Sequence, residues 1–145
     1  MPQTVTVSLP NAPAVVNQTL IPSAAYSPGD LVVVTSAFPV GNFRKAEITV
    51  VGGSLSGNLD VYVQRQLADG ATWDSIAHFA QLGASTPNAV RTLGFVEGTA
   101  NLENSNSQSI AANTVLAVTM GGYWRIFAGM SATGQTFAVY GTFWQ

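Results

Sequence analysis

The sequence predicts an all-β protein built as a two-sheet sandwich. Apolar residues recur at every second position along most of the chain, and no stretch shows the period of an amphipathic helix. Turn signals rich in Gly, Pro, Asn and Ser separate these runs into roughly eight to ten short strands. That many strands in 145 residues fit one sandwich, with a jelly roll favoured and an immunoglobulin-like sandwich as the alternative.

The first 29 residues carry no charged side chain and are interrupted by prolines. We expect range 1–29 to form an extended N-terminal arm or the first strands, and range 30–145 to form the sandwich domain. Alternation predicts strands over 4–9 and Ala14–Ile21, with Pro10 ending the first. The interruptions differ from the basic start and unbroken apolar core of a signal peptide, so none is expected.

The remaining strands follow from short apolar or alternating runs between turn signals. They are expected over Leu31–Thr35, Ala46–Gly52, Leu59–Gln66, Trp73–Leu82, Ala89–Val96, Ile110–Met120, Tyr123–Ala128 and Gln135–Phe143. The clearest hairpin turns through Ala68-Asp69-Gly70. Arg65 falls in phase with the apolar face before that turn, which predicts a bulge or a strand end that leaves the core. Residues Glu97–Ser109, rich in Asn and Ser, are expected to be a loop.

Charge is unusually sparse in this chain. Charged residues make up 8%, with five basic and seven acidic side chains and a net charge of -2. Ser, Thr, Asn and Gln together outnumber them more than threefold. So few basic groups argue against a nucleic-acid partner, because phosphate neutralisation dominates that affinity. A nearly neutral surface favours a subunit that hides part of it in an oligomer, although hydroxyl and amide groups alone can keep such a surface soluble.

The sequence offers little support for a cofactor site or a membrane span. The chain has no cysteine, which excludes disulfides, thiolate nucleophiles and Cys-type zinc sites. The apolar stretch Ile110–Met120 is too short to cross a bilayer, so we expect no membrane span. No phosphate-binding or dinucleotide fingerprint is present, and no cofactor is expected.

Catalysis would depend on His78, because it is the one histidine. Asp74, Ser75 and His78 lie close in sequence, but strand alternation predicts that Ser75 faces away from the other two. A Ser-His-Asp site requires all three to converge, so we expect no catalytic residue and no enzyme. His78 is interpreted as a structural or interface histidine that can act as a pH-sensitive contact.

Metal and glycosidase sites are also not expected. A calcium site using Asp60, Asp69 or Asp74 would need further oxygen ligands that the sequence does not place. The glutamates, Glu47, Glu97 and Glu103, form no distinctive pair of the kind that glycoside hydrolysis requires.

The aromatic residues divide between core and surface. Trp124 is in phase with Ile126, which predicts burial, whereas Tyr62 shares a face with polar residues and is expected to be exposed. Trp144 lies near the end of the chain and is less constrained. Exposed Tyr62 and Trp144 would suit a sugar-stacking platform, so a carbohydrate-binding sandwich, with a glycan as ligand, is the alternative function.

The hairpins carry a family resemblance. The runs that carry it are Leu59-Asp60-Val61-Tyr62-Val63-Gln64, Thr72-Trp73-Asp74-Ser75-Ile76-Ala77-His78-Phe79, Gly122-Tyr123-Trp124-Arg125-Ile126-Phe127 and Thr133-Gly134-Gln135-Thr136-Phe137-Ala138-Val139. Together they resemble the small β-sandwich virion proteins of tailed bacteriophages over roughly Ala46–Phe143. The chain departs from that pattern at Ser75, where an acid is common, and at Ala138.

The resemblance implies a capsid decoration or cement protein that clamps neighbouring major capsid protein subunits. It would be made in the host cytoplasm and located on the capsid surface of the virion. A component of the phage neck or tail is the alternative location. A homo-oligomer is expected, with a homotrimer favoured. The candidate interface residues are Tyr62, Arg65, His78 and Trp144.

Overall fold

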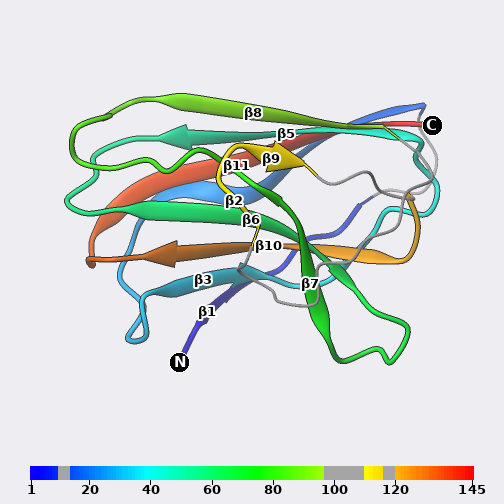
Figure 1. The fold of residues 1–145 in the computed structure, drawn as a ribbon, viewed down its shortest axis with the longest axis horizontal. Coiled ribbons are helices and arrows are strands. Elements are labelled where there is room, and N and C mark those ends of the chain that lie inside the picture. The colour runs from blue at the N-terminus through cyan, green and yellow to red at the C-terminus, as the bar shows by residue number, and fades with distance from the viewer. Residues whose placement is uncertain (10–13, 97–109, 116–119) are drawn as a thin grey trace.

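The computed structural model describes residues 1–9, 14–96, 110–115 and 120–145, which form two packed β-sheets (Figure 1). The strands are β1 (Gln3–Val5), β2 (Val15–Tyr26), β3 (Val32–Thr35), β4 (Phe38–Pro39), β5 (Lys45–Gly52), β6 (Leu59–Gln66), β7 (Trp73–His78), β8 (Val90–Val96), β9 (Thr114–Val115), β10 (Tyr123–Met130) and β11 (Gln135–Trp144). Within these residues no helix has the length and apolar character needed to cross a membrane. The predicted all-β sandwich is confirmed.

The strand order defines a jelly roll. Sheet A has the order β1-β3-β10-β6-β7-β9, with β4 beside β10, and sheet B has the order β2-β11-β5-β8. Antiparallel pairs form from the two ends of the chain inward: β2 with β11, β3 with β10, β5 with β8, and β6 with β7. This nested pairing is that of a long hairpin rolled into two sheets. The favoured jelly roll is therefore confirmed, and the immunoglobulin-like alternative is wrong.

The N-terminal part contributes one strand to each sheet. β1 lies parallel to β3, and β2 pairs with β11 along the edge of sheet B. β2 continues past its expected end at Ile21, through Pro22, because an edge strand can carry a residue that lacks a backbone N–H. Leu20 and Ile21 are fully buried, so β2 is part of the core of this chain.

Other strands differ from the expected ranges, most by one or two residues at an end and a few by more. β1 covers only part of range 4–9, and β4 was not predicted because it is a two-residue strand beside β10. β7 ends at His78, beyond which Leu82 keeps an isolated bridge to Leu59. In the described part of Ile110–Met120 the strand is reduced to β9, and residues 116–119 lie outside the description. The loop expected at Glu97–Ser109 also lies outside the described residues.

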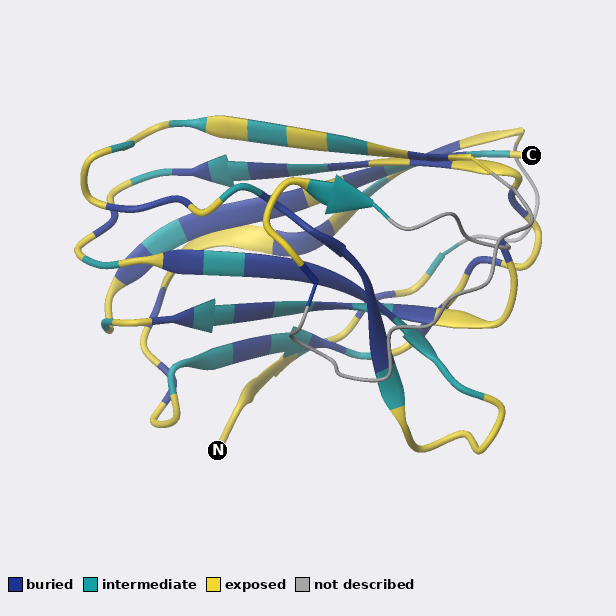
Figure 2. Cartoon of the chain, viewed as in Figure 1, coloured by how far each residue is buried: buried dark blue, intermediate teal, exposed yellow. Residues whose placement is uncertain are grey.

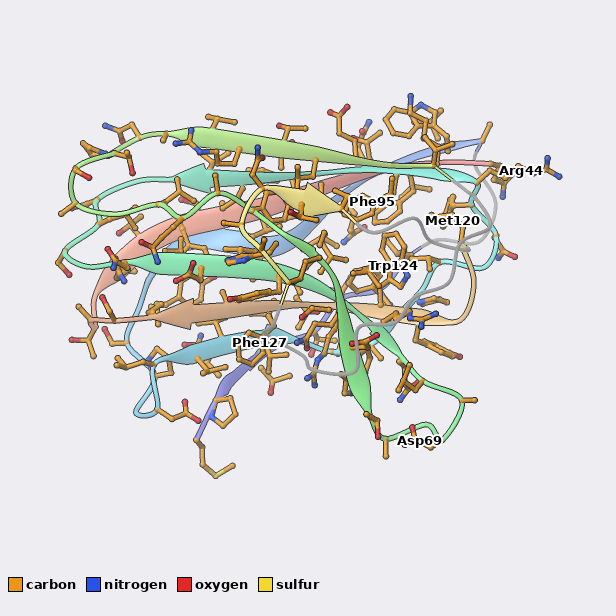
Figure 3. The ribbon with its side chains drawn as sticks, in the orientation of Figure 1. Arg44, Asp69, Phe95, Met120, Trp124 and Phe127 are labelled. Carbon is orange, nitrogen blue, oxygen red and sulfur yellow. The ribbon has the colours of Figure 1, made fainter. Side chains whose placement is uncertain are left out.

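The core lies between the sheets, and its buried residues come from strands of both (Figure 2). Trp124 and Ile126 of β10 are both fully buried, which confirms their predicted shared face. The ring of Trp124 packs 5.1 Å from the ring of Phe95 on β8, so this pair joins the two sheets. Figure 3 shows these two rings close to Met120 at one end of the sandwich.

The β6–β7 hairpin projects beyond the body of the sandwich (Figure 1). Its loop closes with a hydrogen bond from the Leu67 N–H to the Thr72 carbonyl and turns at Gly70, whose φ of 70° suits glycine. The Thr72 hydroxyl and the backbone N–H groups of Thr72 and Ala71 donate to Asp69 and hold its pKa at about 2. The predicted hairpin and its turn are confirmed, and its exposed tip is ordered by these bonds.

One prediction concerns the tight packing under β11. A Cβ at Gly141 would lie 2.7 Å from Phe143 Cε2 and 3.1 Å from Leu20 Cδ1, whereas a Cβ at Gly94 of β8 meets nothing within 4 Å. We expect Gly141→Ala to lower the free energy of unfolding by about 1–3 kcal/mol through overpacking. Gly94→Ala, the matched control, should leave it unchanged or slightly higher. Urea denaturation checks both, and equal midpoints for the two variants would contradict this packing.

Candidate functional site

A polar cluster lies on the outer face of sheet A, where β6, β7 and β10 run side by side. Its position depends on a bulge in β7. Tyr62 pairs with His78 and Val63 with Ala77, but Gln64 pairs with Ser75, so Ile76 is an extra residue. The extra residue shifts the alternation of β7, as a β-bulge does. This bulge lies in β7 and not in the strand of Arg65, which runs beside β10 without a register shift, so Arg65 stays in phase with the inward residues of β6 and the bulge predicted for its own strand is absent.

The bulge also corrects the predicted faces of β7. Ser75 and His78 pair with Gln64 and Tyr62, which both point outward, so Ser75 and His78 share a face. Asp74 pairs with Arg65 on the opposite face. The prediction that Ser75 faces away from His78 was wrong because simple alternation ignores the extra residue. The separation of Asp74 from Ser75 was predicted correctly.

His78 is held by two acceptors. Its Nδ1 lies 3.0 Å from the carbonyl oxygen of Ile110, and its Nε2 lies 3.1 Å from Asp60 Oδ1. Both partners offer oxygen acceptors, so a ring nitrogen of His78 that carries a hydrogen can donate it to the oxygen it faces. Gln81 Nε2 donates to the second oxygen of Asp60 at 2.7 Å. Asp60 is thereby fixed from two sides.

Tyr62 is buried, not exposed as the sequence predicts. Only 8% of it is accessible, since its ring stacks on the His78 ring at 4.0 Å with an interplanar angle of 16°. The ring of Phe127 meets it edge-on at 6.2 Å. Burial, and then the charge of Asp60, raise the pKa of the Tyr62 hydroxyl. His78 therefore covers one face of the Tyr62 ring, and little of the residue remains accessible for stacking.

Beside this cluster the sheet surface is hollowed. A cavity of about 370 Å³ is open to solvent at the start of β6 and the end of β10. Gly129, with no side chain, lies between Val32 of β3 and Asp60 of β6 at its floor. Phe127, the outward residue two positions before Gly129 on β10, also lines the cavity. Figure 3 shows Phe127 apart from Trp124. Tyr62 also lines this hollow, and the combination of two aromatic residues with a polar rim has the character of a small-ligand site.

A second cluster lies further along the same outer face. Arg125 Nε donates to Gln64 Oε1 at 2.8 Å, and its guanidinium stacks 4.4 Å from the ring of Trp73. Burial lowers the pKa of Arg125. The guanidinium of this arginine is thus engaged twice within the chain, by Gln64 of β6 and Trp73 of β7, which makes the cluster a structural support for the β6–β7 hairpin.

Arg65 and Asp74 form an ion pair on the inward face of the same hairpin. Arg65 Nη2 lies 4.0 Å from Asp74 Oδ2, with side chains 29% and 3% exposed. Asp74 Oδ1 has no hydrogen-bond partner among the described residues. Burial raises the pKa of Asp74 above its ordinary value of 3.8, against the opposing effects of Arg65 and the Ser75 backbone.

Trp144 lies on the outer face of sheet B, away from the other candidate residues. Lys45 Nζ sits 4.7 Å from the centre of its ring. Apart from Lys45 and Glu47 the face is neutral: Thr49 and Thr92 bond hydroxyl to hydroxyl at 2.9 Å across β5 and β8, and Tyr140 is 40% exposed. The strand registers place the outward residues in rows, and these are Val15, Asn17, Thr19, Lys45, Glu47, Thr49, Val51, Val90, Thr92, Gly94, Val96, Tyr140, Thr142 and Trp144. We call this set the sheet B face.

The structure therefore divides the four candidate interface residues among three places. Tyr62 and His78 stack on each other, Arg65 turns inward, and Trp144 belongs to the sheet B face. Sequence reasoning missed Phe127 and Gly129 as lining residues. The alternation along β10 could have identified them. Phe127 and Gly129 alternate with Trp124, Ile126 and Ala128, so they must face outward if those three residues belong to the core. Among the described residues no group of three or more His, Asp or Glu side chains is placed to hold a metal ion.

These features define a jelly-roll β-sandwich with a hollowed polar face on one sheet and a neutral face on the other. The sequence matches no protein-family model and no curated protein. A collagenase pre-peptidase C-terminal domain from Bacillus anthracis is 14% identical at a TM-score of 0.46, covering 98% of this chain and 94% of that one. A structure of infectious bursal disease virus, Gx strain, is 15% identical at a TM-score of 0.39, covering 89% of this chain and 39% of that one. Both likenesses are too distant to carry a function to this chain.

Proposed function

We propose that this chain is a virion structural protein of a tailed bacteriophage, a decoration protein that binds the outside of the head and clamps major capsid protein subunits. It would act by surface contact, with no bond made or broken. The resemblance of the hairpins to phage virion proteins supports the assignment as a virion protein. The sheet B face is the observation that supports binding to the capsid by surface contact. Its outward side chains are Thr, Val, Asn, Tyr and Trp, with Lys45 and Glu47 as its only charges.

Such a face suits repeated contact with a protein lattice. Val90 and Val96 are 54% and 66% exposed, and burying them against a partner is favourable at about 25 cal/mol per Å². The hydroxyls of Thr49 and Thr92 already bond to each other, which lowers the cost of removing them from water. Lys45 and Glu47 lie two residues apart on the same side of β5 and offset each other's charge. The partner is accordingly expected to be neutral where it meets this face.

The test places one charge in the face. Thr92→Glu should weaken binding to capsids that lack the protein by about tenfold or more, because a carboxylate would be buried without a partner. Ala71→Glu, at the exposed tip of the β6–β7 hairpin, adds the same charge elsewhere and should bind like the unmodified chain. Co-sedimentation with particles assembled from the coat protein of the same phage measures both. Unchanged binding by Thr92→Glu would exclude this face, and attachment only to necks or tails would replace the head assignment.

The proposal includes a homotrimer, since a closed ring hides more of a sparsely charged surface than a monomer does. At roughly 20 micromolar, light scattering should give three times the chain mass of 15.1 kDa. A single species at the chain mass would rule out a trimer formed before attachment.

A further inference from the structure

We propose that the hollow over Gly129 binds one neutral saccharide unit. Gly129 leaves the surface of sheet A bare between Val32 and Asp60, and a Cβ at this position would meet only Phe127 Cε1, at 3.8 Å. The cavity of about 370 Å³ lies at the small end of the range for ligand pockets, which suits a single sugar ring.

The rim supplies both hydrogen-bond donors and acceptors. Carboxylates come from Asp30 and Asp60, amides from Asn58 and Gln81, and a hydroxyl from Ser131. Sugar hydroxyls donate and accept, so this mixture is complementary to them, whereas two carboxylates would repel an anion. The side chain of Phe127 gives the hollow an apolar wall for the C–H face of a pyranose ring.

Asp60 is already held in place to accept hydrogen bonds from a sugar. His78 and Gln81 hold its two oxygens at 3.1 and 2.7 Å, and each oxygen keeps a second lone pair for a ligand hydroxyl. Fixing a side chain before binding lowers the entropy lost on binding.

This site is independent of the proposed capsid contact. The hollow belongs to sheet A, while the sheet B face lies on the other layer of the sandwich. A chain bound to a particle through the sheet B face would present the hollow to the surrounding solution.

The test uses the full chain on an array of bacterial and animal glycans, followed by titration with the methyl glycosides of glucose, galactose and mannose, monitored by amide NMR. We expect a bound glycan, with shifts at Gly129, Phe127 and Asp60. Gly129→Val fills the floor with a residue that strands favour, and it should lower affinity at least tenfold. Gly94→Val in β8 is the matched control and should bind like the unmodified chain. Gln81→Ala, which removes one exposed support of Asp60, should also weaken binding even if Gly129→Val fails to fold.

Three outcomes would overturn the saccharide site. They are no glycan bound by the unmodified chain, equal binding by Gln81→Ala and folded Gly129→Val, or binding of arginine or lysine peptides that salt abolishes in place of any glycan. None of them bears on attachment through the sheet B face, because Thr92→Glu tests that contact separately.

Discussion

Replacing Trp124 with alanine is expected to lower the free energy of unfolding by about 3–5 kcal/mol. The side chain is fully buried and packs against Phe95 across the two sheets. Its loss leaves a cavity at the end of the sandwich where β10 pairs with both β4 and β6. Urea denaturation followed by tryptophan-independent far-ultraviolet circular dichroism measures the change.

Two controls separate the cavity from other effects. Trp124→Phe keeps most of the ring volume and removes an indole N–H that has no hydrogen-bond partner among the described residues, so it should cost clearly less. Tyr123→Ala changes the neighbouring residue, which is 48% exposed, and should shift stability by about 0.5 kcal/mol or less. A loss for Trp124→Ala no greater than that for Tyr123→Ala would contradict the packing described between the sheets.

Replacing Arg65 with methionine is expected to cost about 3 kcal/mol at pH 7, because it leaves the Asp74 carboxylate buried without its cation. The double variant Arg65→Met with Asp74→Asn removes the charge as well and should recover most of the loss. Chemical denaturation of the two single variants and the double variant gives the coupling between the side chains. Additive losses would show that the pair does not interact.

The cost of Arg65→Met should also depend on pH. The folded-state pKa of Asp74 is raised above 3.8, so the stability gained from its protonated form is fully present below pH 3.8 and is lost as pH rises through the folded pKa. Removing Arg65 removes an effect that lowers this pKa. The loss relative to the unmodified chain is therefore expected to be smaller at pH 4 than at pH 7. A loss of equal size at both pH values would mean that Asp74 does not carry it.

Local pattern was sufficient to predict most of the strands and the inward face of β10. Trp124 and Ile126 showed their shared inward face by alternation alone, and the Ala68-Asp69-Gly70 turn identified the central hairpin. These features depend on residues close in sequence. The jelly-roll order could only be favoured, because the pairing of β2 with β11 joins the two ends of the chain and leaves no local signal.

The candidate site was less predictable because it depends on one extra residue. Ile76 shifts β7, places Ser75 and His78 on one face, and brings His78 over the ring of Tyr62. A buried Ile in a strand of buried residues gives no sign that it is a bulge. The burial of Tyr62 follows from that stacking, so its predicted exposure was wrong for the same reason.

The most direct test of the account is electron microscopy of phage particles whose genome encodes this chain. The account predicts density for the jelly roll on the outside of the head, with the sheet B face against capsid subunits and the Gly129 hollow turned outward. The account would be contradicted if no density for the jelly roll lay on the capsid subunits and mass spectrometry showed that the particles lack the chain.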